Sequence, residues 1–302
     1  MSEPTGQSAR ASLGTAPFAD LLRIEELDKN LFRGWCHAGA PMRAFGGQVA
    51  AQALTAAGRT IGPERTVHSL HSYFLRPGDP TQPITYEVDR VREGLTYATR
   101  RVTAVQRDEA IFTLSASFKI PEEAESRQRT MPPVPGPEGL PDPFRARAQA
   151  DPEAYAATAG FRTLDLRFIP ADAPGIPAET PGVPQQFVWL RAGTPLPQDD
   201  QLLQVCALTY LSDLTLASTA TLHLQLPLFQ RTEPPAVIIA SLDHAMWFHR
   251  PFRADEWLLF AQRSPSASDG RGLAHGEFYN REGLLVASAV QEALIRDRRT
   301  HR

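Results

Sequence analysis

The amino-acid sequence predicts an α+β protein with two similar halves, each a long helix wrapped by an antiparallel sheet. The first half contains an Ala-rich helical stretch at 47–57, and the second contains an apolar helical stretch at 201–217. Strand-like runs follow each of these stretches, which is the pattern of an internal repeat. A third observation separates the halves, since fifteen of the 27 prolines lie within 121–197. The chain is therefore predicted to be bipartite.

The strand-like runs are rich in β-branched and aromatic residues, and hairpin signals join them into antiparallel meanders. The helical stretch at 201–217 is apolar nearly all round, so a sheet is expected to enclose it. The predicted strands cover 67–76, 84–92, 96–106 and 110–120 in the first half, and 237–250, 257–264, 272–280 and 284–296 in the second.

The two halves can be aligned residue by residue. Residues 73–77 align with residues 247–251, whose numbers are 174 higher. Gln48 aligns with Gln204, whose number is 156 higher. The difference between the two offsets indicates an insertion after the second helix, around 222–235. A duplicated helix-plus-meander predicts two equivalent modules.

The proline-rich segment sets the predicted boundaries. The first module is predicted at 18–120, a Pro-rich linker at 121–185, and the second module, which carries the candidate catalytic residues, at 186–296. So many prolines are incompatible with a long helix or a central strand. Only short helical pieces are expected in this linker, near 143–159.

Composition excludes several classes of protein. A net charge of −3 does not suit a broadly basic nucleic-acid surface. No run approaches the roughly 18 apolar residues of a membrane span, and residues 1–17 lack the apolar core of a secretion signal. Two cysteines, Cys36 and Cys206, are too few for a disulfide framework or an ordinary zinc site. We therefore expect a soluble protein with no nucleic-acid partner.

Common catalytic and nucleotide-binding motifs are missing from the sequence. It contains no G-x-S-x-G, no P-loop and no G-x-G-x-x-G after a strand. His68 and His71 form an H-x-x-H pattern, but on a strand these positions point to opposite faces and cannot chelate one metal ion. A structural role is therefore favoured for these histidines.

Asp213 is the first candidate functional residue. It lies late in the apolar helix, among leucines, where burial without a partner raises the pKa of a carboxyl toward the range of a general base. The alternative interpretation is that Asp213 caps the end of the helix or the next turn.

Gln291 is the second candidate. It lies in an apolar strand and shares a face with Ala287, Ala289 and Ala293, whose small side chains leave room for a ligand or a water. A buried amide needs partners for its donors and its acceptor, so it must join a network. A glutamine that bonds to backbone at a strand end is equally compatible with the pattern.

Ser241 is the third candidate, although a lone hydroxyl in an apolar strand is usually satisfied by the local backbone. The repeat adds information, because the first half has no acid, hydroxyl or amide at the position that matches, respectively, the acid, the hydroxyl or the amide of the second half. This asymmetry argues against a purely structural need for them. Asp213, Ser241 and Gln291 lie respectively over Ala57, Val67 and Ser117.

Several long sequence strings resemble the acyl-CoA thioesterase II family. The resemblance covers about 18–120 and 186–296, and it excludes the Pro-rich middle. It implies a double hotdog fold, with two helix-wrapped sheets side by side in one chain, in agreement with the repeat. The strings are Phe-Gly-Gly-Gln-Val at 45–49, together with residues 68–79, 243–252, 276–279 and 286–292.

This resemblance implies hydrolysis of fatty acyl-CoA to free fatty acid and CoA, by direct attack of a water that Asp213, Ser241 and Gln291 hold. The middle residue is Ser where the bacterial prototype has Thr, and the hydroxyl is retained. A neighbouring backbone N–H or helix N-terminus is expected to stabilise the oxyanion. No acyl-enzyme, metal ion or redox cofactor is expected. Arginines near the site are expected to meet the CoA phosphates.

Two other functions remain open, an acyl-CoA hydratase of the same fold and a non-catalytic acyl-CoA-binding module. The Asp/His pair of a hydratase-type motif was not found. By analogy with related sheets that pair edge to edge, we expect a homodimer or homotetramer. Residues 299–302 lack the Ser-Lys-Leu type of peroxisomal signal seen in eukaryotic relatives, which favours a bacterial cytoplasmic enzyme.

Overall fold

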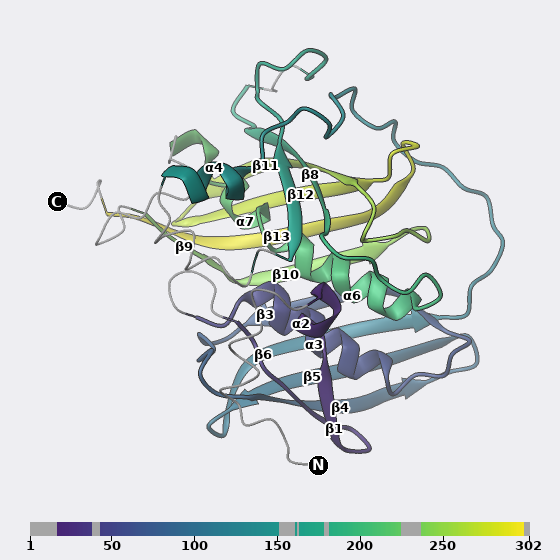
Figure 1. Cartoon of the computed structure of the whole chain (residues 1–302). Coiled ribbons are helices and arrows are strands. Elements are labelled where there is room, and N and C mark those ends of the chain that lie inside the picture. Colours follow the sequence, from purple (N-terminus) through teal and green to yellow (C-terminus); the bar gives the residue numbers. More distant parts are fainter. Residues whose placement is uncertain are drawn as a thin grey trace.

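One antiparallel sheet runs through both halves of the chain (Figure 1). In the computed structural model, thirteen strands of the described residues form this sheet. Its order is β1-β2-β4-β5-β6-β3 from the first half, then β10-β13-β12-β11-β8-β7 from the second, with β9 paired to β13. The predicted α+β class is confirmed. The structure describes residues 17–37, 43–150, 161, 163–177, 181–224 and 237–298.

The first half consists of one long helix packed on a six-stranded portion of the sheet. Helix α3 contacts all six of these strands. Half of its buried residues are alanines, so the helix backbone can approach the sheet closely. The elements are α2 Phe18–Leu21, β1 Ile24–Asp28, β2 Leu31–Gly34, α3 Gly46–Gly58, β3 Thr66–Phe74, β4 Ile84–Glu93, β5 Tyr97–Gln106 and β6 Glu109–Lys119.

The second half repeats this plan with a shorter main helix. Its elements are α4 Pro143–Ala150, β7 Leu164–Phe168, β8 Gln185–Ala192, α6 Gln201–Ser212, α7 Leu216–Thr219, η2 Leu222–Leu224, β9 Val237–Ser241, β10 Asp243–Phe248, β11 Leu258–Ser268, β12 Arg271–Tyr279 and β13 Leu285–Asp297. The insertion expected around 222–235 lies mostly outside the described residues.

The helix predicted at 201–217 was wrong at its C-terminal end. Helix α6 stops at Ser212, with Asp213 as its C-cap residue, and α7 begins only at Leu216. The Leu214 N–H bonds to the Leu211 carbonyl, a spacing of three residues that tightens the last turn. The apolar pattern continues through this break because both helices bury leucines, so periodicity alone did not reveal it.

The segment predicted as a linker is more ordered than expected. It contributes α4, and it also contributes β7, which pairs with β8 at the edge of the sheet where proline-rich flanks are tolerated. The same segment covers an apolar surface of the second half, where Trp189 donates its indole N–H to the Pro135 carbonyl at 2.8 Å. Met131 and Val134 pack against this surface too. The boundaries at 18–120, 121–185 and 186–296 stay a prediction.

The halves meet where β3 pairs with β10. His71 pairs with Ala245, the residue that lies over it at the offset of 174. A residue that pairs with its own equivalent in the other half lies on a local two-fold axis, as in an isologous dimer interface. The neighbouring pairs are reciprocal, as such an axis requires. They are Leu70 with Met246, and Ser72 with His244.

Helices α3 and α6 lie next to each other at this junction (Figure 1). Each carries a buried glutamine at the aligned position, and both glutamines tie loops to the helices. The side-chain oxygen of Gln48 accepts from the His37 backbone N–H at 2.9 Å, and that of Gln204 accepts from the Ala254 N–H at 2.7 Å. The helix offset of 156 therefore describes equivalent places in space.

Candidate active site

The structure brings all three candidate residues together. Gln291 donates its side-chain N–H to Asp213 Oδ1 at 2.6 Å and to Ser241 Oγ at 3.0 Å. The Ser241 hydroxyl donates to Asp213 Oδ1 at 3.3 Å. One carboxylate oxygen thus accepts from an amide and a hydroxyl that come from two neighbouring strands. The three side chains therefore lie within hydrogen-bond distance of one another, and their catalytic roles stay a prediction.

Local structure aims each side chain at this point. Asp213 stands at the end of α6, where the chain leaves the helix and the carboxylate turns toward the sheet. Ser241 is the last residue of β9, and it pairs with Ala293 on β13. Gln291 is fully buried on the inward face of β13, flanked by small residues as the alternation predicted. Its amide donors reach side chains rather than backbone groups.

Asp213 is poised to exchange a proton near neutral pH. Burial raises the pKa of the Asp213 carboxyl to about 6, although hydrogen bonds from Gln291, Ser241 and the Gly47 backbone N–H oppose that rise. A carboxyl with such a pKa is ionised at neutral pH and yet basic enough to accept a proton. The interpretation of Asp213 as a helix cap also holds for its backbone, but the side chain joins the cluster.

The N-terminus of α3 completes the site from the first half of the chain. The Gly47 backbone N–H faces the Asp213 carboxylate and helps to hold down its pKa. A Cβ at Gly46 would lie 2.8 Å from Asp213 Oδ2, so only glycine permits this approach. The positive end of a helix dipole therefore faces the carboxylate. The sequence contains a signal for this close approach, because two adjacent glycines, Gly46 and Gly47, open the predicted helix.

The first half lacks a corresponding polar cluster among the described residues. Ala57 and Val67, which lie over Asp213 and Ser241, are both buried in the apolar core. The position aligned with Gln291 was wrong by one residue. Ser72 pairs with Leu114, and its counterpart Met246 pairs with Ala289. Two residues further along each strand, Ala116 is therefore the equivalent of Gln291. Ser117 points to the opposite face of the sheet.

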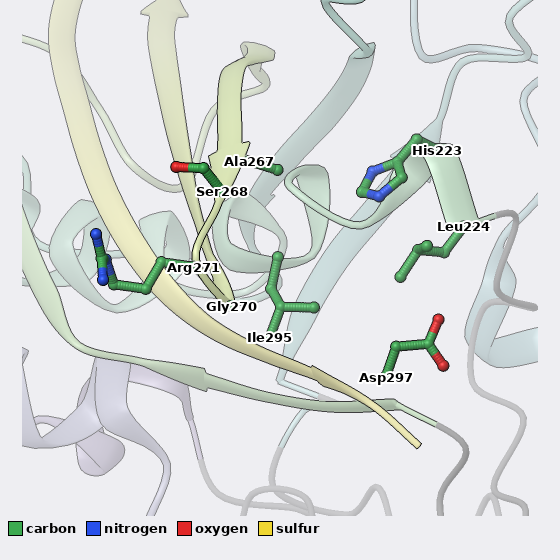
Figure 2. Close-up of a pocket in the computed structure, with 8 residues that line it drawn as sticks. All are labelled: His223, Leu224, Ala267, Ser268, Gly270, Arg271, Ile295 and Asp297. Atoms are coloured by element: carbon green, nitrogen blue, oxygen red, sulfur yellow. The ribbon is translucent and has the colours of Figure 1, made fainter. Parts of the chain in front are cut away.

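A separate pocket of about 260 Å³ lies at the far end of β11, β12 and β13 (Figure 2). Figure 2 shows His223 and Leu224 across from Ile295 and Asp297, with Arg271 directed away. The Arg271 guanidinium is already paired with Asp269 and Glu292. None of the three candidate residues lines this pocket, so we assign it no part in their chemistry.

Other titratable groups form no second reactive centre within the ranges that the structure describes. No group of three or more His, Cys, Asp or Glu residues in those ranges is arranged to hold a metal ion. Cys36 and Cys206 are buried, and burial raises the pKa of each thiol to about 12, which leaves both unreactive. None of the described helices has the length and apolar stretch needed to cross a bilayer.

Comparison with known protein families gives two matches that together span most of the chain. Residues 32–119 match the family described as "Acyl-CoA thioesterase N-terminal domain", and residues 130–295 match "Acyl-CoA thioesterase C-terminal domain". The second match includes most of the Pro-rich segment, which agrees with the packing of that segment on the second half.

Individual relatives agree with these matches. The "Acyl-CoA thioesterase 2" of Haemophilus influenzae is 38% identical over 280 residues, covering 91% of this chain and 96% of the relative. The crystal structure of the acyl-CoA thioesterase II TesB2 from Mycobacterium marinum superposes with a TM-score of 0.77 at 44% identity, covering 92% and 97% of the two chains. A hot dog fold protein from Alicyclobacillus acidocaldarius has a TM-score of 0.72 at 24% identity, covering 92% and 97%, and indicates the fold alone.

Proposed function

The chain belongs to the acyl-CoA thioesterase family, and from that premise we propose that Asp213, Ser241 and Gln291 hold the water that attacks the thioester. The protein is an acyl-CoA thioesterase with a double hotdog fold. The roles of individual residues rest on the site itself. The observation that carries them is a buried carboxylate, held by an amide and a hydroxyl, at one end of the helix pair only.

In the proposed reaction, a water bonded to the cluster loses a proton to the Asp213 carboxylate while its oxygen bonds to the thioester carbonyl carbon. The carbonyl oxygen becomes an oxyanion, which the positive end of α3 at Gly46 and Gly47 stabilises. Collapse of the tetrahedral intermediate breaks the C–S bond. CoA leaves as a thiolate that takes up the proton, and the acyl group leaves as a free fatty acid.

Positioning and one general base suffice for this reaction because a thioester is an activated acyl group and a thiolate is a good leaving group. Gln291 and Ser241 orient the carboxylate and keep it ionised near neutral pH, since each donates a hydrogen bond to its charged form. No side chain of this cluster needs to become acylated.

Release of free thiol from palmitoyl-CoA and from a short acyl-CoA tests the reaction. A hydratase would add water to an unsaturated acyl-CoA without releasing thiol, and a binding module would bind ligand without turnover. Labelled acyl-CoA, quenched early in the reaction, tests the mechanism. Direct attack by water leaves no label on the protein, whereas a burst of CoA with acyl-labelled protein contradicts it.

Two further properties are part of the proposal. We expect a homodimer or homotetramer, and the exposed Tyr73 and Leu75 at the central junction of the sheet favour contact with another copy. We also place the enzyme in the cytoplasm, where its substrate class is made and used. Light scattering of the purified protein and fractionation of the source cells test these two points; a monomer or a membrane-bound pool contradicts them.

A further inference from the structure

Two buried polar atoms close to the Asp213 cluster have no hydrogen-bond partner among the described residues. One is Gln291 Oε1, on the same amide whose N–H groups serve Asp213 and Ser241. The other is His244 Nδ1. Gln291 is fully buried and His244 is only 1% exposed. A buried polar atom left without a hydrogen bond destabilises the folded state, so each of these two atoms needs a partner.

The sheet places these two side chains next to each other. Ala245 pairs with Val290, and the same register continued by one residue sets His244 opposite Gln291; both side chains are buried. Directly opposed residues of an antiparallel pair have Cβ atoms about 4.5–5.5 Å apart.

A β-bulge makes this arrangement possible. Ser241 pairs with Ala293 and Ala245 with Val290, so the β9–β10 side contains one extra residue between these pairs. Without the bulge, Ser241 and His244 would point to opposite faces because they are three residues apart. With it, both side chains reach the interior. Bulges that redirect a side chain in this way are common beside active sites.

The hydrogen bonds of His244 identify which atom is free. The Ser212 hydroxyl donates to the Thr209 carbonyl at 2.8 Å and lies 2.7 Å from His244 Nε2. His244 Nε2 therefore carries the proton and donates it to Ser212, which leaves Nδ1 as an acceptor. Burial lowers the pKa of His244 to about 4, so the ring is neutral at neutral pH. Gln291 Oε1 is an acceptor as well.

The repeat shows that this fold has no structural need for His244. At the matching places in the first half the polar side chains are replaced by apolar ones, all of them buried. Leu70 and Ala56 take the places of His244 and Ser212, and they fill the core without any hydrogen bond. The polar set is thus Ser212, Asp213, Ser241, His244 and Gln291, and its apolar counterpart is Ala56, Ala57, Val67, Leu70 and Ala116.

We propose that one buried water donates its two hydrogens to Gln291 Oε1 and His244 Nδ1, which makes His244 a positioning residue for the Gln291 amide. Two facing acceptors require a small molecule with two donors, and water is the species that fits between opposed strand residues. This water lies on the side of the amide away from Asp213, so it is distinct from the water that attacks the thioester.

This inference rests on the proposed function. Its consequence there is that the bound water fixes the orientation of the Gln291 side-chain amide. With Oε1 anchored, the Gln291 N–H groups can only face Asp213 and Ser241. Without the anchor the amide can rotate and turn its oxygen toward the carboxylate. The hydrogen bond that holds down the pKa of Asp213 is then lost, and activity falls off at a higher pH on the acid side.

Two substitutions of His244 distinguish the role of Nδ1 from that of Nε2. His244→Asn places a polar atom near the position of Nδ1 and removes the bond to Ser212, whereas His244→Gln places its amide near the position of Nε2 and removes the acceptor. We expect His244→Asn to keep kcat and the pH profile close to those of the parent. His244→Gln should lower kcat on the order of tenfold, with KM nearly unchanged and the acid limb shifted upward. The reverse pattern would show that His244 acts only through Ser212 and would overturn the proposal.

A high-resolution crystal structure of the unchanged protein gives a readout that does not depend on either variant folding. We expect a water within hydrogen-bond distance of both Gln291 Oε1 and His244 Nδ1, and the absence of any such density overturns the proposal. Asp213→Asn is measured alongside. If that variant stays active, the proposed function fails; if it is inactive and no water is found, only the further inference fails.

Discussion

The two ends of the α3–α6 helix pair differ in chemistry although their backbones are equivalent. At one end Asp213 meets the start of α3 at Gly46, with a carboxylate oxygen 2.8 Å from the place a Cβ would occupy. At the other end Leu202 of α6 packs on Gly58 of α3, 2.4 Å from the corresponding Cβ position. The close contact between the two helices is thus made by an acidic side chain at one end and by a leucine side chain at the other. The two helices approach each other closely at both ends, and the leucine at the second end shows that this packing does not require a polar side chain.

The largest effect expected from this comparison follows from removing the proposed general base at the polar end. Asp213→Asn keeps the shape and polarity of the side chain but removes its ability to accept a proton. We expect kcat to fall by about 10²–10⁴-fold with KM little changed, since that is the usual contribution of a positioned base. Steady-state thiol release measures it. Ser117→Ala, on the opposite face of the sheet in the first half, serves as the control and should leave turnover nearly unaltered.

The next largest effect is expected from adding a methyl group to the glycine at either end of the helix pair. Gly46→Ala brings a methyl group against the Asp213 carboxylate and the Phe74 ring, so we expect kcat to fall about 10- to 100-fold as the base is displaced. Gly58→Ala is the matched variant, because its methyl group meets only the end of the Leu202 side chain. It should change thermal stability and leave kcat within about twofold. Equal losses of activity in both variants would contradict a special role for the polar end.

Replacing the amide by its first-half counterpart should have a smaller effect. Gln291→Ala removes orientation but leaves the base, so we expect kcat to fall about tenfold, less than for Asp213→Asn. In the proposed mechanism Asp213 acts while ionised, so parent activity should be lost as the pH falls through about 6. Removal of the Gln291 hydrogen bond raises the pKa of Asp213, and the midpoint of this acid limb should move to higher pH. A midpoint that stays in place or moves down would show that the amide does not act on the carboxylate.

The smallest expected effect is on stability. The pKa of Asp213 is raised to about 6 in the folded protein from 3.8, so the folded state holds the proton more tightly than the unfolded chain. Stability therefore decreases as the pH rises from about 4 to about 6, and the cost persists at neutral pH. Asp213→Asn removes this cost and should be about 1 kcal/mol more stable than the parent at neutral pH. Denaturant unfolding of both proteins, repeated near pH 4 where the difference should shrink, measures it.

Much of the fold followed from local pattern. The alternation of apolar residues predicted the strands, and the aligned strings around Tyr73 and Trp247 predicted the duplication, because side-chain periodicity is a property of neighbouring residues. Asp213 and Gln291 were found as polar residues inside apolar elements, a signal that one sequence contains in full. The predicted strands omitted β1, β2, β7 and β8, which are short or lie beside the Pro-rich segment, and the single run predicted at 237–250 is divided between β9 and β10.

The sequence by itself determined the repeat, the main helix and the central strands of each module, and which residues of the second half are polar inside apolar elements. The tertiary structure decided which atoms meet. Only the crossing of α3 over α6 brings Gly47 from the first half to Asp213 of the second, and only the bulge after Ser241 turns His244 inward. The same kind of register shift makes Ala116, not Ser117, the counterpart of Gln291. Crossings and bulges depend on contacts between residues far apart in the chain, and periodicity along one strand does not encode them.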